Sequence, residues 1–159
     1  MKLHKMKSKH YLYLLLLMLF ACQSNNKPAN EGFFDAELAA KLGADQYGMK
    51  SYVMAFLKSG PNRNQDSMQA AVLQRAHLDN ITRMANEGKL VIAGPFLDDG
   101  NVRGIYIFNV ATVEEAEGLV KTDPAIQAGR LIMELHPWYG SAALMEVNHL
   151  HKKLSKEPI

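Results

Sequence analysis

His77 stands at a position of the sequence where an apolar residue is expected. Leu73, His77, Ile81 and Met84 recur at the spacing of one helix face, within a segment that is helical in pattern from about residue 65 to residue 87. An imidazole can accept or donate a proton near neutral pH, so His77 could act as a general acid or base. The alternative is a buried structural histidine that donates a hydrogen bond to a backbone carbonyl.

Five further residues are candidates for contact with a ligand. Arg63, in a loop with the sequence GPNR, could clamp an anionic ligand or be merely solvated. Gly94 and Pro95 are predicted to end a strand at a close backbone approach, at the edge of a cleft. Trp138 could wall a pocket or pack in the core, and His136, near the end of the last strand, is the rival site histidine.

The sequence gives little support for metal or cofactor chemistry. Cys22 is the single cysteine, and His149 and His151 are two positions apart, so they do not share a helix face. No glycine-rich phosphate loop, serine elbow or cluster of metal ligands is recognisable. We therefore expect chemistry that needs no cofactor and no metal.

The first 21 residues have the features of a secretory signal. Four lysines and no acid precede the ten-residue apolar run 11–20, which is too short to span a bilayer as a helix. The run ends in LFAC, which resembles the bacterial lipobox, whose cysteine is lipidated; the alternative is an ordinary signal peptide with an incidental cysteine. We expect cleavage before Cys22, lipidation of Cys22 and anchoring in the membrane of a bacterial cell envelope.

The net charge of the chain depends on this segment. The full chain has 18 Lys+Arg against 16 Asp+Glu, a net charge of +2, and loss of the four lysines leaves 14 basic residues against 16 acidic ones. The remaining slight negative charge gives no indication of nucleic-acid binding. Residues 22–34 are polar and short of hydrophobic side chains, which is typical of a flexible tether.

The rest of the chain alternates strand and helix patterns. Strand patterns cover residues 51–60, 89–96, 103–110 and 131–138; helix patterns cover 65–87 and 113–121, and a short helix follows Asp123 as its cap. The order βαββαβ predicts an α+β protomer of the ferredoxin-like type. A helical extension at 35–50 and a C-terminal helix or tail at 140–159 flank it, and Asp99-Gly100 predicts a tight turn between the middle strands.

Three of the four predicted strands are apolar on both faces. Because the helices of this fold lie on one face of the sheet, the other face needs a cover. A second copy of the chain would supply it and make a homodimer, and the C-terminal helix at 141–154 is the alternative. We expect the dimer.

Several motifs together resemble the YCII-related domain family. They are the histidine of the first long helix, GKLVIAGPF, the glycine that opens the third strand, and DPAIQAGR before the last strand, all within residues 51–138. YGMKSYVMAFLKSGPNR and HPWYGSAAL further resemble an exported subgroup of that family. The resemblance implies that residues 51–139 form the protomer of a dimeric α/β barrel.

The resemblance also implies a site. Members of the family have a cleft with a histidine and an aspartate, proposed as an acid/base pair, which in this chain are His77 and Asp123. By its position alone Asp123 is a helix cap, and a carboxylate has a second oxygen with which to orient a histidine. Some members have an arginine four residues before the histidine, where this chain has Leu73, while Arg75 lies on another helix face.

The implied function is proton transfer on a small, ring-containing molecule, as in an isomerase or a lyase that needs no cofactor. Relatives by fold include enzymes that act on small ring compounds. Two alternatives stay open: a module that binds a small ligand without turnover, and a structural dimer in which His77 only packs.

Overall fold

Four antiparallel strands and the helices that pack on them make up residues 34–157, the part of the chain that this computed structural model describes. The predicted signal segment, the Cys22 anchor and nearly all of the predicted tether lie outside the described residues. In chain order the elements are α2 (Ala36–Leu42), β1 (Met49–Ser59), α3 (Ser67–Asn86), β2 (Leu90–Pro95), β3 (Val102–Phe108), α4 (Val113–Val120), α5 (Pro124–Gln127), β4 (Leu131–Ser141), the 3-10 helix η2 (Ala142–Glu146) and α6 (Val147–Leu154).

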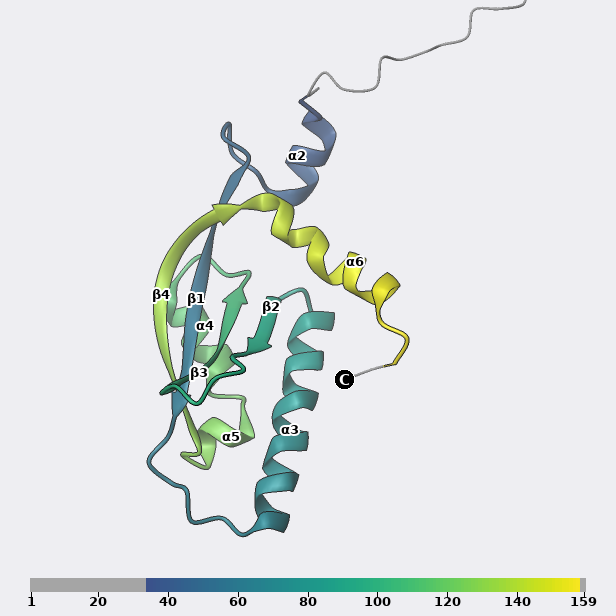
Figure 1. The fold of residues 1–159 in the computed structure, drawn as a ribbon. Helices are drawn as coiled ribbons and strands as arrows, with labels where there is room; N and C mark the ends of the chain where they lie inside the picture. Colours follow the sequence, from purple (N-terminus) through teal and green to yellow (C-terminus); the bar gives the residue numbers. More distant parts are fainter. Residues whose placement is uncertain (1–33, 158–159) are drawn as a thin grey trace, which may run out of the picture. The chain divides into compact units, whose positions relative to one another are not determined.

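The sheet has the strand order β2-β3-β1-β4, with every neighbouring pair antiparallel. The long helix α3 runs beside β2, and α6 follows directly after η2 at the end of β4 (Figure 1). This order and connectivity confirm the predicted α+β fold of the ferredoxin-like type.

The main core lies between the sheet and the helices α3 and α4. Alternate residues of β1 face it: Val53, Ala55 and Leu57 pack with Met84 of α3 and Ala116 of α4. All five side chains are buried, so this layer excludes water and holds α3 in a fixed position against the sheet.

The start of α3 is determined by a capping box. The Asp66 carboxylate accepts a hydrogen bond from the Gln69 backbone N–H (2.8 Å), and the Gln69 side chain accepts one from the Asp66 N–H (3.3 Å). The helix therefore begins at Ser67, slightly later than predicted. Its buried residues are His77, Asn80 and Met84, so the stripe inferred from the sequence does face inward.

The C-terminal part of the chain covers one end of the second face of the sheet and leaves the other end without a cover. Leu144 and Met145 of η2 pack on a buried cluster of Tyr52, Val91 and Ile107. The segment 141–154 is thus divided into η2 and α6 and is not one continuous helix. The C-terminal segment, which the sequence offered as the alternative to a second copy of the chain, therefore covers part of this face, and the expected dimer stays a prediction.

The other end of the second face carries apolar side chains that are partly exposed. Register pairs Phe56 of β1 with Ile105 of β3, and Lys58 of β1 with Ile132 of β4. Phe56 and Ile105 are half-buried, and Ile132 is 47% exposed. An ion pair between Lys58 and Glu134 borders them.

The strands β2 and β3 approach each other closely at the end of their pairing. Pairing ends at Pro95 and Gly104, and the connection spans residues 96–101, so it is longer than the tight Asp-Gly turn that the sequence predicted. A Cβ atom on Gly104 would lie 2.5 Å from the carbonyl oxygen of Gly94 and 3.1 Å from Pro95 Cα. Only glycine therefore allows this approach.

We expect Gly104→Ala to destabilise the fold by about 1–3 kcal/mol, because the added methyl group would force two backbones apart. Urea unfolding followed by circular dichroism measures the change. Gly118→Ala in α4 is the matched control: nothing lies within 4 Å of its added Cβ, and we expect a gain of up to about 1 kcal/mol from helix propensity. Equal stability of Gly104→Ala and wild type would contradict the close approach.

Candidate functional site

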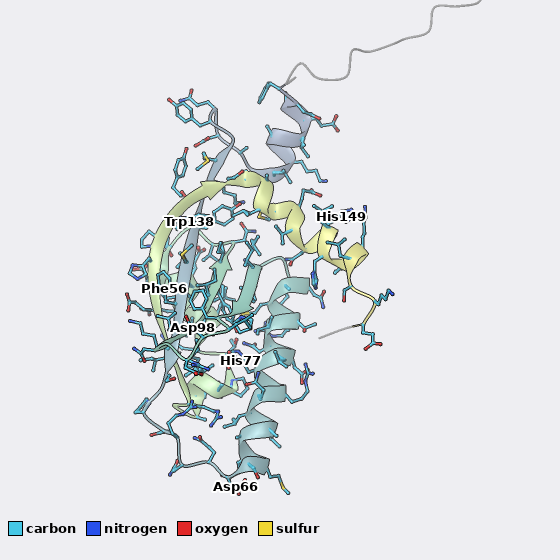
Figure 2. The ribbon with its side chains drawn as sticks, viewed as in Figure 1. Phe56, Asp66, His77, Asp98, Trp138 and His149 are labelled. Carbon is cyan, nitrogen blue, oxygen red and sulfur yellow. The ribbon has the colours of Figure 1, made fainter. Side chains whose placement is uncertain are left out.

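The centre of the candidate site is a contact between α3 and the start of α5. His77 Nδ1 lies 2.6 Å from Oδ2 of Asp123, although the two residues are 46 positions apart in the chain. Only 7% of His77 is exposed, and Asp123 is completely buried. In Figure 2, His77, a residue of α3, lies below Trp138 and above Asp66 at the start of that helix.

Asp123 performs two tasks with its two carboxylate oxygens. Oδ2 faces His77, and Oδ1 accepts a hydrogen bond from the Ala125 backbone N–H (2.9 Å), which caps α5. Pro124 at the first helical position suits this cap because it has no N–H to satisfy. The cap holds the carboxylate in place, so Oδ2 is fixed toward the imidazole.

Tyr106 of β3 faces the other ring nitrogen of His77. Its hydroxyl oxygen lies 3.2 Å from Nε2, and the two rings are nearly parallel, with 19° between their planes. Burial, and secondly the negative charge of Asp123, raises the pKa of Tyr106 above its usual range. Tyr106 is therefore a neutral phenol that can donate to Nε2, and Asp123, His77 and Tyr106 form a continuous hydrogen-bonded chain.

A cavity of about 440 Å³ opens beside this chain, between α3, the ends of β2 and β3, and the loop after β1. His77 and Tyr106 line it, and so do three residues named from the sequence: Arg63, Gly94 and Pro95. The volume is in the range of sites for small organic molecules. Asp123 does not line the cavity and reaches it only through His77.

The structure does not bring His136 or Trp138 to this cavity. His136 Nε2 lies 2.8 Å from Glu134 Oε1, and its ring contacts Phe56 edge-on. Trp138 packs at a tilt against Tyr52. The reason is strand alternation: both residues share the parity of Glu134 and point to the second face of the sheet, away from α3.

Among the cavity residues that sequence reasoning did not propose for the site, Tyr106, Arg103 and Arg130 carry groups that could act on a ligand. A signal existed for Tyr106, because it lies two residues from Phe108 in β3 and so shares the helix-side face. Its hydroxyl is nevertheless indistinguishable in a sequence from that of a tyrosine that only packs. The arginines lie at the ends of strands, where periodicity carries no information.

Within residues 34–157, no group of three or more His, Cys, Asp or Glu side chains is placed to hold a metal ion. The same part of the chain has no helix long and apolar enough to cross a membrane.

Comparison with known proteins identifies the family. The model of the YCII-related domain matches residues 18–139, most of the chain. The chain belongs to the YCII-related domain family. The match begins well before β1, earlier than the sequence resemblance suggested.

Other comparisons add little about this YCII-related domain. No curated protein matches the chain. Among solved structures, it is similar to the 5-chloro-2-hydroxyhydroquinone dehydrochlorinase of Burkholderia phenoliruptrix AC1100, solved in complex with 2,5-dihydroxybenzoquinone. The identity is 20% and the TM-score 0.42, over 56% of this chain and 93% of the other. Similarity at this level says nothing about the reaction.

We expect neutral His77 to carry its proton on Nδ1, because Asp123 accepts there and Tyr106 can donate to Nε2. Nitrogen-15 NMR of the imidazole distinguishes the two tautomers. In Asp123→Asn the side-chain oxygen can keep the cap on Ala125, so the amide nitrogen faces Nδ1 and the proton should move to Nε2. Replacement of the charge-assisted hydrogen bond by a neutral one should lower the free energy of unfolding by about 1–3 kcal/mol.

Asp98→Asn is the control for this experiment, because Asp98 lies in the exposed loop after β2 and bonds only to Gly100. Its His77 signals should be those of the wild type. A wild-type His77 with its proton on Nε2 would contradict the assigned chain of hydrogen bonds.

Proposed function

We propose that this YCII-related protein is an enzyme that transfers a proton within, or removes one from, a small organic molecule in the cavity beside His77. The observation that carries the proposal is the series of hydrogen bonds from Asp123 to His77 and from His77 to Tyr106. Both His77 and Tyr106 line the cavity. No cofactor is needed for this chemistry. The reaction class is isomerisation or elimination.

In the proposed step, Nε2 of His77 removes a proton from a substrate carbon next to a carbonyl group. The electron pair of the broken C–H bond moves into an enolate, and Asp123 stabilises the resulting imidazolium through Nδ1. For this step the Tyr106 hydroxyl must turn its proton from Nε2, which frees the Nε2 lone pair, and it then donates to the enolate oxygen. The proton then returns to another carbon in an isomerisation, or a leaving group departs with its electron pair in an elimination.

A structural role is the competing account, and one observation favours it. Both ring nitrogens of His77 have partners within the protein, as expected of a buried histidine that only stabilises the fold. We prefer the enzymatic account because His77 lines a cavity that a ligand can enter. A histidine that only stabilises the fold does not need such a cavity beside it.

The test is exchange of carbon-bound hydrogen for deuterium in heavy water, measured on a panel of cyclic enones, lactones and hydroxyquinones. We expect His77→Gln to lower kcat/KM at least about 100-fold, the usual contribution of a general base, with a smaller loss for Tyr106→Phe. His136→Gln is the matched control, because His136 lies on the other face of the sheet. Circular dichroism verifies that each variant is folded.

Full activity of His77→Gln, or loss of activity in His136→Gln, would contradict the assignment. Tight binding of a panel compound without exchange in any variant would favour the binding module, in which the same cavity holds a ligand without turnover.

We further propose that the exposed end of the second sheet face is covered by a second copy of the chain, which gives a homodimer. Phe56 and Ile105 are opposite each other on that face, Ile132 is diagonal to Phe56 beside the Lys58–Glu134 ion pair, and the cover by η2 does not include them. Exposed apolar side chains on the face of a sheet are typical of an interface between protein chains. The half-buried state of Phe56 and Ile105 leaves area to be removed from water.

We expect Ile105→Glu to turn the dimer into a monomer, because the glutamate would bring a charge into an apolar interface. Light scattering at micromolar concentration gives the mass. Leu97→Glu introduces the same charge on a loop residue that is 99% exposed and should leave the dimer intact. A monomeric wild-type chain would refute the interface.

The location that we propose is the bacterial cell envelope. The support is sequence-based: a lysine-rich start, a ten-residue apolar run and LFAC, in which Cys22 would carry the lipid. The enzyme would then be anchored to the membrane by its lipid, with the domain at 35–159 outside the bilayer.

A further inference from the structure

We propose that the cavity beside His77 takes a small organic anion, whose negative group pairs with the guanidinium groups of Arg63, Arg103 and Arg130. This inference rests on the proposed function, because it treats that cavity as the substrate site. It adds the chemical class of the substrate, an apolar skeleton that carries a carboxylate or an equivalent anionic group.

The cavity is lined by positive charge without compensation. Arg63, Arg103 and Arg130 all line it, and no Asp or Glu from the part of the chain that the structure describes does so. Asp123 is completely buried, with one oxygen on His77 and the other on Ala125. Because arginine stays protonated at all ordinary pH values, the cavity attracts anions.

The partners of the three arginines are neutral oxygen atoms. Arg63 Nη1 donates to the carbonyl of Arg130 (3.3 Å), and Arg103 Nη1 donates to the carbonyl of Gly100 (3.2 Å). Arg130 Nη1 donates to Gln65 Oε1 (3.0 Å). These bonds orient the guanidinium groups, which come from three separate segments, and leave their charges available to a ligand.

Other cations of the described chain are arranged differently. Lys58, Arg75 and Arg83 each form an ion pair with a carboxylate. A second cavity of about 430 Å³, between α3, β2 and α6, has lining residues of both signs, such as Lys152 and Glu157. The uniform positive charge is therefore a property of the His77 cavity and not of cavities in this domain generally.

The apolar part of the lining defines the rest of the ligand. Leu57, Leu78, Ile81 and Leu131 contribute hydrocarbon surface to the same cavity. A molecule with one anionic end and an apolar body would satisfy both kinds of lining. The positive charges would also stabilise the enolate that forms when His77 removes a proton, so they would serve catalysis as well as binding.

The experiment compares anionic and neutral probes of the same shape on the full-length chain in detergent. The probes are benzoate, phenyl phosphate and the neutral benzamide, with binding followed by NMR or calorimetry. We expect benzoate or phenyl phosphate to bind about tenfold or more tightly than benzamide, with an affinity that falls as salt is added. Preference between the two anions distinguishes a carboxylate from a phosphate substrate.

Single variants locate the binding. Arg63→Gln and Arg103→Gln should each weaken binding of the preferred anion about fivefold to tenfold, as expected when one charge-assisted hydrogen bond is lost. Arg75→Gln is the matched control, because Arg75 is on α3 like His77, pairs with Asp79 and does not line the cavity. Its affinity should equal that of the wild type.

Equal affinity for benzoate and benzamide, no binding of either anion, or equal weakening by Arg75→Gln and Arg103→Gln would overturn the inference. The result is separable from the test of the proposed function, because it measures binding and not turnover. Arginine-dependent anion binding by a chain that exchanges no carbon-bound hydrogen would support the anion site and contradict the enzyme.

Discussion

The hydrogen bond between Asp123 and His77 is the interaction on which the rest of the site depends. A carboxylate that is completely buried needs partners for its charge, and this one has a ring N–H on one oxygen and a backbone N–H on the other. The first joins α5 to α3, and the second starts α5. The line of hydrogen bonds continues from His77 to Tyr106 of β3, so α3, α5 and the sheet are all connected through one imidazole.

The charges of the site are arranged in order of depth. Asp123 is completely buried behind His77, His77 and Tyr106 are buried and line the cavity, and the exposed Arg63 and Arg103 line it as well. An imidazole in this arrangement is polarised from behind by the carboxylate, while a ligand in front meets positive charge. The same residues that make the buried carboxylate tolerable therefore also orient a proton acceptor toward the cavity.

Patterns in the sequence predicted the fold and one residue, His77, of the His77–Asp123 pair. Helical periodicity placed His77 on the inner face of its helix, and strand patterns gave the element order. Asp123 came from the family resemblance alone, because periodicity does not relate residues 46 positions apart. Tyr106 was missed since a tyrosine among apolar strand residues looks like core, and His136 was misplaced since its strand has one mixed face. The break within 141–154 follows from tertiary packing on the sheet, which no local pattern encodes.

Neighbouring residues of strand β3 belong to different faces of the sheet and have different roles. Tyr106 and Phe108 face the helices, and Tyr106 also lines the cavity, whereas Ile105 and Ile107 face the second side of the sheet. Because the side-chain period of a strand is two, insertion or deletion of one residue here would exchange the two sets and bury the phenol on the wrong side. The length of this strand is therefore more constrained than the identity of its residues. The loop after β1 and the helix α3 also line the cavity, and changes there can alter what it accepts without shifting this register.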